Sequence, residues 1–140
     1  MDTLGMLIDK LTIVKLKQYH GGDKEPLQVI EHNLLSEIDA FVENAVFGVV
    51  PRSKLTAPAC KVYKKEGNEM PVQEHHGLGS LVSELAHVNC ELWHVQEKVY
   101  DFESVPADKK DEVIRALAVL NLQRNNCIDT IDRKFAEMVT

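Results

Sequence analysis

Apolar residues recur at alternating steps of three and four positions between residues 78 and 102, and this pattern constrains the fold more than any other feature. The stripe consists of Leu78, Leu81, Leu85, Val88, Leu92, Val95, Val99 and Phe102. An α-helix makes one turn in about 3.6 residues, so this spacing places the whole stripe on one helical face. A seam of this kind is typical of helices that pack side by side in a bundle.

Three further segments show the same periodicity and predict helices at about 3–20 and 26–46 and from Pro106 to about 139. Gly21 and Gly22 separate the first two, which favours an antiparallel helical hairpin. We therefore expect an all-α fold, a four-helix bundle of long amphipathic helices in one domain spanning residues 1–140. The last helix would reach about 50 Å, so either a kink near Asn125 and Asn126 or a projection beyond the bundle is expected.

Residues 49–76 lack this periodicity and contain Pro51, Pro58, Pro71 and Gly67. They predict a long irregular crossover between the second and third helices. Because loops of this length are uncommon in compact domains, the segment should be functional, disordered, or packed over the bundle. Residues 60–63 are the candidates for a short strand within it.

The composition excludes several classes of protein. A net charge of −6 argues against a nucleic-acid binder, which usually presents a basic face. No apolar run approaches the roughly 18 residues of a membrane span, and the N-terminus lacks the features of a signal peptide, so the expected location is the cytoplasm. The spacing of Cys60, Cys90 and Cys127 matches no zinc motif or disulfide framework.

Arg124 falls in the middle of the apolar stripe of the last helix. A lone buried guanidinium is costly, so either the stripe opens to solvent at this level or a carboxylate from another helix meets the arginine. Lys15 interrupts the first helix in a similar way, and we expect its charged end to reach water while its stem is buried.

Two consecutive Glu-x-x-His units share one face of the third helix, formed by Glu84, His87, Glu91 and His94. This spacing occurs in di-metal carboxylate bundles, where the units come from different helices, and it makes His87, Glu91 and His94 candidate ligands of a divalent metal. Facing carboxylates would come from the other helices, where the candidates are Asp9, Glu31, Glu37, Asp39, Asp129 and Asp132. The stripe flanks the predicted core, so a solvated face or a polar contact between helices is the alternative.

Trp93 points away from the apolar seam of its helix, so either the crossover or a second subunit should cover it. Ile13 and Leu16 also lie outside the apolar stripe of the first helix. Extra apolar surface on two helices predicts a homo-oligomer.

Two segments, LVSELAHVNCELWHVQEKVYD and LNLQRNNCIDTID, resemble a family of bacterial proteins classed as domain-of-unknown-function family 4254. This chain is similar to the family because both combine an Asn-x-x-Leu-Trp-His segment with a later Leu-Asn-x-x-Arg-Asn helix. The resemblance implies an all-helical fold and no established activity. It assigns the motif positions to Asn89, Trp93, His94, Asn121, Arg124 and Asp132.

The sequence does not decide whether the protein is an enzyme, because it has no phosphate loop, no Gly-x-Ser-x-Gly elbow and no His-Glu-x-x-His run. The first hypothesis is a non-catalytic, oligomeric interaction protein in which Arg124 joins a polar network between helices. The second is a bundle, with hydrolysis as its candidate reaction, that binds a divalent metal or a small anionic ligand. Its binding residues would be Glu84, His87, Glu91, His94, Asn121 and Arg124.

Overall fold

The computed structural model describes residues 1–58 and 77–140, and four long α-helices form the fold of these residues. The helices are α1 (Leu4–Tyr19), α2 (Lys24–Val46), α3 (Leu78–Tyr100) and α4 (Lys110–Val139). Single turns of 3-10 helix lie in the connections, namely η1 (Arg52–Lys54), η2 (Phe102–Ser104) and η3 (Ala107–Lys109). No strand occurs in the two described ranges, and the predicted all-α fold is confirmed.

The ends of the first two helices follow from local chemistry. Thr3 caps α1, because its hydroxyl oxygen accepts a hydrogen bond from the backbone N–H of Met6. The chain leaves α1 through Gly21 and α2 through Gly48, at φ angles of 83° and 75°. Glycine adopts this left-handed conformation without the strain that a Cβ would cause.

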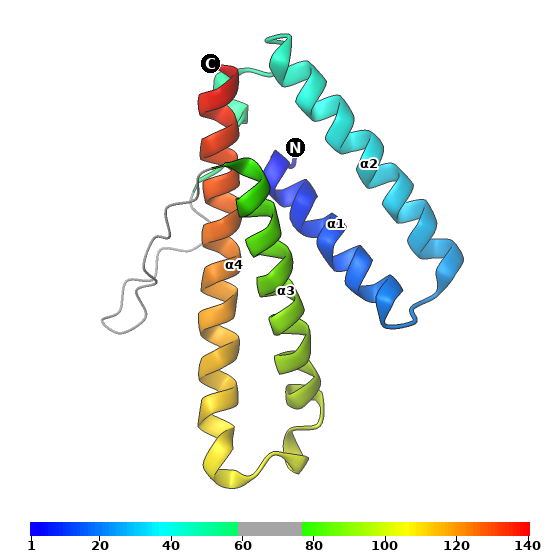
Figure 1. Ribbon diagram of the computed structural model, residues 1–140, viewed down its shortest axis with the longest axis vertical. Helices are drawn as coiled ribbons and strands as arrows, with labels where there is room; N and C mark the ends of the chain where they lie inside the picture. The colour runs from blue at the N-terminus through cyan, green and yellow to red at the C-terminus, as the bar shows by residue number, and fades with distance from the viewer. Residues whose placement is uncertain (59–76) are drawn as a thin grey trace.

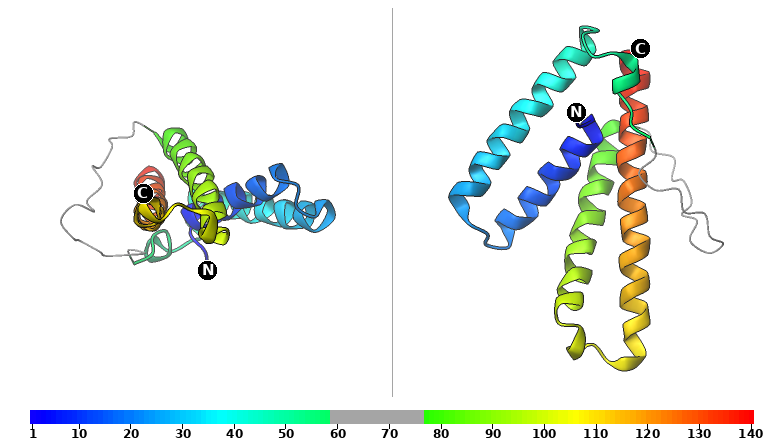
Figure 2. Two further views of the ribbon diagram at one scale, coloured as in Figure 1. Left: turned by 90° about the horizontal axis from the view of Figure 1, so that it is seen from below. Right: turned by 180° about the vertical axis from the view of Figure 1, so that it is seen from behind.

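The helix α1 lies between α2 and the pair formed by α3 and α4. It packs against all three, and Figure 1 and the rear view in Figure 2 show α2 on its outer side. Near its C-terminal end α2 also reaches α4, where the rings of Phe41 and Phe135 lie 6.1 Å apart. The four helices therefore form layers, in the order α2, α1 and the α3–α4 pair.

One apolar core joins the four helices. Leu81, Leu85 and Ile131 are its most completely buried side chains, and the first two belong to the seam predicted on α3. Leu55, in the described part of the crossover, is 2% exposed and packs into the same core. The rest of the predicted crossover, including the candidate strand at residues 60–63, lies outside the described residues.

The helices α3 and α4 continue past the end of α1, and we call residues 96–118 the overhang. Figure 1 shows this part of the hairpin extending beyond the α1–α2 turn. The helix α4 runs unbroken through Asn125 and Asn126, and its 30 residues span about 45 Å. The length of α4 is therefore accommodated by projection beyond the bundle, which was one of the two predicted alternatives. Of the helices in the described ranges, none combines the length and apolar composition that a membrane span requires.

Candidate functional site

Arg124 on α4 forms a bidentate ion pair with Asp9 on α1. Its Nε donates to Asp9 Oδ1 at 2.8 Å, and its Nη2 donates to Asp9 Oδ2 at 2.6 Å. The side chain of Asp9 is 6% exposed and that of Arg124 is 31% exposed. A carboxylate from another helix therefore explains the arginine in the apolar stripe, which was one of the two predicted explanations.

Asn89 on α3 and Thr12 on α1 extend this contact. Asn89 Nδ2 donates to Asp9 Oδ1 at 2.9 Å and to Thr12 Oγ1 at 2.8 Å. The Thr12 hydroxyl donates to the backbone oxygen of Asp9 at 2.7 Å. We call these four residues the polar junction, because they tie α1 to both α3 and α4.

The polar junction is satisfied by contacts within the chain. Across the described residues, every buried side-chain nitrogen and oxygen has a hydrogen-bond partner. A fully hydrogen-bonded network in a low-dielectric interior holds its members in one arrangement. Breaking any of its hydrogen bonds leaves a polar group with neither a protein partner nor water. The polar junction therefore fixes the position of α1, and Arg124 engages both carboxylate oxygens of Asp9.

A second polar contact holds the start of α1 against α4. Asp132 is 2% exposed, and its Oδ1 accepts a hydrogen bond from the backbone N–H of Gly5 at 2.7 Å. Burial raises the pKa of the Asp132 carboxyl above its usual value, and hydrogen bonds from Thr3 and Gly5 partly oppose the shift. A Cβ on Gly5 would lie 2.5 Å from the backbone oxygen of Ile128, so a glycine is needed for this approach.

The residues of α1 that make these contacts were not predicted as a group. Asp9 was predicted only as a carboxylate that could face a metal, and no role was predicted for Gly5 or Thr12. The three lie at positions i, i+4 and i+7, which is one helical face. A row of small and polar residues beside the apolar stripe was the signal for a second packing face on α1.

Three residues of the Glu/His stripe, His87, Glu91 and His94, are exposed and pair within α3, whereas Glu84 is half-buried. His87 Nε2 lies 2.9 Å from Glu91 Oε1, and His94 Nδ1 lies 3.5 Å from Glu97 Oε1. No three His, Cys, Asp or Glu side chains in residues 1–58 and 77–140 are grouped to hold one metal ion. The structure thus does not bring His87, Glu91 and His94 to a common point, and the metal site stays a prediction.

Arg124 and the Glu/His stripe lie on different sides of the α3–α4 pair. The four stripe residues are roughly 140–220° around α3 from Asn89, which faces the ion pair of Asp9 and Arg124. Asn121 is half-buried, and its Nδ2 donates to the backbone oxygen of Leu117 at 3.1 Å. The predicted grouping of Arg124 and Asn121 with the stripe around one ligand is therefore not seen.

Two residues of the stripe, Glu91 and His94, line a groove between α3 and α4. The groove has a volume of about 490 Å³, and its lining residues are Glu91, His94, Val95, Ala116, Val119, Leu120 and Gln123. Most of these side chains are apolar.

Burial and the charge of Glu84 raise the pKa of the Cys127 thiol to about 12, which keeps this thiol protonated and unreactive.

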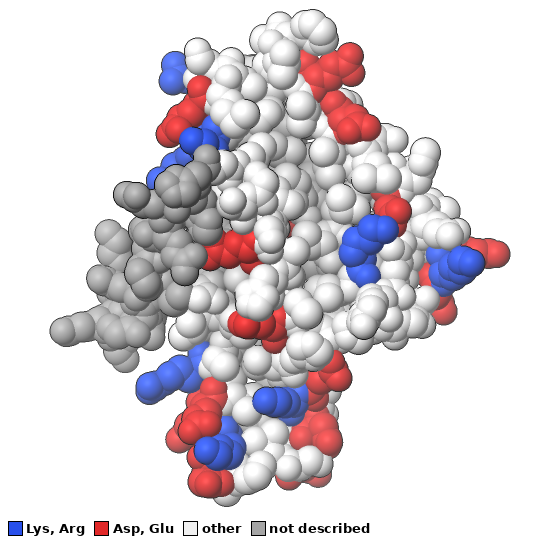
Figure 3. Space-filling model, viewed as in Figure 1, with Lys and Arg blue, Asp and Glu red and all other residues white. Residues whose placement is uncertain are grey.

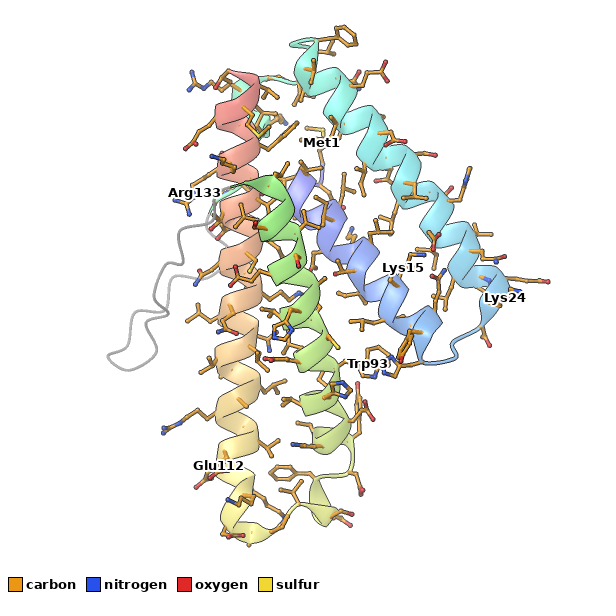
Figure 4. The ribbon with its side chains drawn as sticks, viewed as in Figure 1. Met1, Lys15, Lys24, Trp93, Glu112 and Arg133 are labelled. Carbon is orange, nitrogen blue, oxygen red and sulfur yellow. The ribbon has the colours of Figure 1, made fainter. Side chains whose placement is uncertain are left out.

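Trp93 is half-buried and stacks on His20, at the turn between α1 and α2. The ring centroids lie 4.5 Å apart with an interplanar angle of 19°, and Figure 4 shows the tryptophan directed towards that turn. Within the described residues the cover of Trp93 therefore comes from the end of α1, and burial by the crossover or by a second subunit stays a prediction. The Lys15 side chain is 60% exposed, and its Nζ lies 2.9 Å from Glu31 Oε2 on α2. Its charge reaches water as predicted, but its stem is not buried.

The face of α3 that meets α1 continues onto the overhang. Counting from Asn89, positions i+4, i+7 and i+11 are Trp93, Gln96 and Tyr100. Trp93 is half-buried, whereas Tyr100 is 87% exposed. This face therefore changes from buried to open where α1 ends.

The face of α4 that carries Arg124 continues in the same direction. Leu117 and Ile114 lie seven and ten positions before Arg124, so they share its face. Leu117 is half-buried and Ile114 is 54% exposed. We call the set on both helices beyond α1 the overhang face; it consists of Gln96, Tyr100, Ile114 and Leu117.

No protein-family model, curated protein or solved structure matches this chain. The resemblance to family 4254 therefore stays a prediction.

Proposed function

We propose that this protein is a non-catalytic helical interaction protein that forms a homodimer through the overhang face. The observation that supports this function is the continuity of one packing face. The side of α3 and α4 that binds α1 through the polar junction runs on past α1, where Tyr100 and Ile114 are exposed. Single exposed apolar residues are ordinary, but a group that extends a packing face favours a protein interface.

A second copy of the chain is the occupant that best fits this face. Two antiparallel hairpins that each lack cover on one side can pair about a two-fold axis and bury the same patch on both subunits. Such a pairing turns the two overhangs into a four-helix arrangement, which buries Tyr100, and tyrosine is enriched at interface cores.

The charges of the overhang suit a copy of itself. Figure 3 shows acidic and basic side chains next to one another over this part of the hairpin. The acidic residues are Glu97, Asp101, Glu103, Asp108, Asp111 and Glu112, and the basic ones are Lys98, Lys109, Lys110 and Arg115. Because both signs are present, an antiparallel copy can match unlike charges, whereas a strongly charged partner such as nucleic acid would meet repulsion.

The self-contained polar junction supports a structural role over a catalytic one. Asp9 and Arg124 bind each other, and Asn89 and Thr12 complete the network. The polar junction would fix the position of α1 along α3 and α4. The end of α1 in turn determines where the overhang face begins. The cytoplasm stays the predicted location on the sequence argument alone.

Sedimentation velocity tests the proposed dimer. The wild-type protein should sediment with twice the 15.8 kDa mass of one chain. Ile114→Glu and Tyr100→Glu place a charge in the proposed interface and should give monomers with unchanged helical circular dichroism. Val29→Glu is the matched control, because Val29 is 61% exposed on α2 and should leave the dimer intact.

Two results would overturn this function. One is a wild-type protein that stays monomeric up to its highest soluble concentration. The other is a dimer that dissociates with Val29→Glu and persists with Ile114→Glu, which would put the interface on α2.

A further inference from the structure

A cysteine and a histidine one turn apart on α3 form a pair that the proposed function does not use. Cys90 Sγ lies 3.9 Å from His94 Nε2. Cys90 is half-buried, and the side chain of His94 is 63% exposed, so ions in solution can reach the pair. Residues at positions i and i+4 are neighbours on a helix, and the helix holds this spacing without help from other elements.

The distance between the two atoms fits the coordination of one zinc ion. With a Zn–S bond near 2.3 Å and a Zn–N bond near 2.05 Å, a tetrahedral angle places sulfur and nitrogen about 3.6 Å apart. The observed separation exceeds this by a few tenths of an ångström, which a small side-chain rotation corrects. A thiolate with an imidazole is also a ligand set that suits zinc better than magnesium or calcium.

Glu97 orients the imidazole for this task. Its Oε1 lies 3.5 Å from His94 Nδ1. A carboxylate next to one ring nitrogen favours the tautomer that carries hydrogen there, and this leaves the lone pair on Nε2, which faces Cys90. The same carboxylate–histidine arrangement supports zinc-binding histidines in general.

His20 is the nearest further imidazole. Its ring centroid lies 6.3 Å from that of His94, and its Nδ1 lies 2.8 Å from the backbone oxygen of Leu16. That contact places hydrogen on Nδ1 and the lone pair on Nε2. His20, Cys90 and His94 are not yet grouped around one point in the described residues, because the His20 ring rests on Trp93.

We propose that Cys90, His94 and His20 bind one zinc ion, with water as the fourth ligand. The Cys90 thiol loses its proton to solvent as the Zn–S bond forms, and the two neutral imidazoles donate their Nε2 lone pairs. His20 leaves the face of Trp93 to reach the ion. Binding therefore changes the surroundings of the tryptophan, and this site is independent of the proposed dimer.

A fluorescence titration with Zn²⁺ tests the site, because Trp93 is the only tryptophan in the sequence. We expect a saturable change with one ion per chain, and with Co²⁺ a thiolate-to-metal charge-transfer band. Cys90→Ser, His94→Gln and His20→Gln should each weaken binding by roughly tenfold or more. Measurements are made in a Cys60→Ser background, so that this thiol contributes no band.

His87→Gln is the control, since His87 lies on the same helix and pairs with Glu91. It should bind zinc with unchanged affinity. Absence of saturable binding would overturn the proposal, as would a charge-transfer band that persists in Cys90→Ser. An unchanged affinity in His20→Gln would contradict the three-residue site, and equal weakening by His87→Gln would place the metal on the Glu/His stripe.

Discussion

Replacing Asp9 with leucine should be among the most destabilising single changes in this chain. It removes the carboxylate that accepts two hydrogen bonds from Arg124 and one from Asn89. Losing one member of a fully buried ion pair costs about 3–5 kcal/mol. Because the Arg124 side chain is 31% exposed, water recovers part of this loss, and about 3 kcal/mol is expected. In a chain of this size, a loss of about 3 kcal/mol in the free energy of unfolding lowers Tm by about 10 °C.

The double variant Asp9→Leu with Arg124→Met separates a pairing effect from a simple packing effect. Removing both charges leaves an apolar contact, so the loss should be smaller than the sum of the two single losses by about 2 kcal/mol. Urea unfolding followed by circular dichroism gives the free energies. Asp2→Ala is the control, because it breaks the exposed pair with Lys10 and should cost at most about 0.5 kcal/mol. Additive losses, or a cost below about 1 kcal/mol for Asp9→Leu, would refute the reasoning.

Three further predictions concern single residues. Gly5→Ala should cost about 1–3 kcal/mol in urea unfolding, because its Cβ would meet a backbone oxygen of α4. A Cβ at Gly79 would meet no described residue within 4 Å, so Gly79→Ala should stabilise α3 by about 0.5–1 kcal/mol. Burial raises the pKa of the Asp132 carboxyl above its ordinary 3.8, so the native state binds the carboxyl proton more tightly than the unfolded state does. The free energy of unfolding should therefore fall as pH rises above about 4. Asp132→Asn should remove this pH dependence from the urea midpoints. Iodoacetamide at about pH 8 should label Cys90 in the native protein and reach Cys127 only after denaturation, as read by mass spectrometry; native labelling of Cys127 would contradict the pKa of about 12.

The helices were predictable because their signals are local. The three-and-four spacing around Leu85 and the glycines after α1 specify where helices form and which face is apolar. Arg124 was predictable as a residue that needs a partner, since its cost of burial can be read from its place in the stripe. Both inferences require only the neighbours along one helix.

The packing order and the partner of Arg124 were not predictable in the same way. Asp9 is separated from Arg124 by 115 positions, and several other carboxylates were equally available in the sequence. The position of α2 outside α1 depends on the second face of α1, where Gly5 allows close approach to α4. This position also explains why Ile13 and Leu16 are half-buried, since α1 packs against other helices on more than one side. Trp93 was expected to need cover, but its stacking partner His20 is the C-cap of α1, and the periodicity does not specify where the end of α1 lies along α3.

Hydrogen exchange measured at high and at low protein concentration tests the proposed interface most directly, because it reports both association and its place. The account predicts that peptides covering residues 96–118 exchange more slowly at high concentration, while peptides from α2 exchange at the same rate in both samples. Protection that depends on concentration only in α2, or exchange that is independent of concentration throughout the overhang, would contradict the central claim.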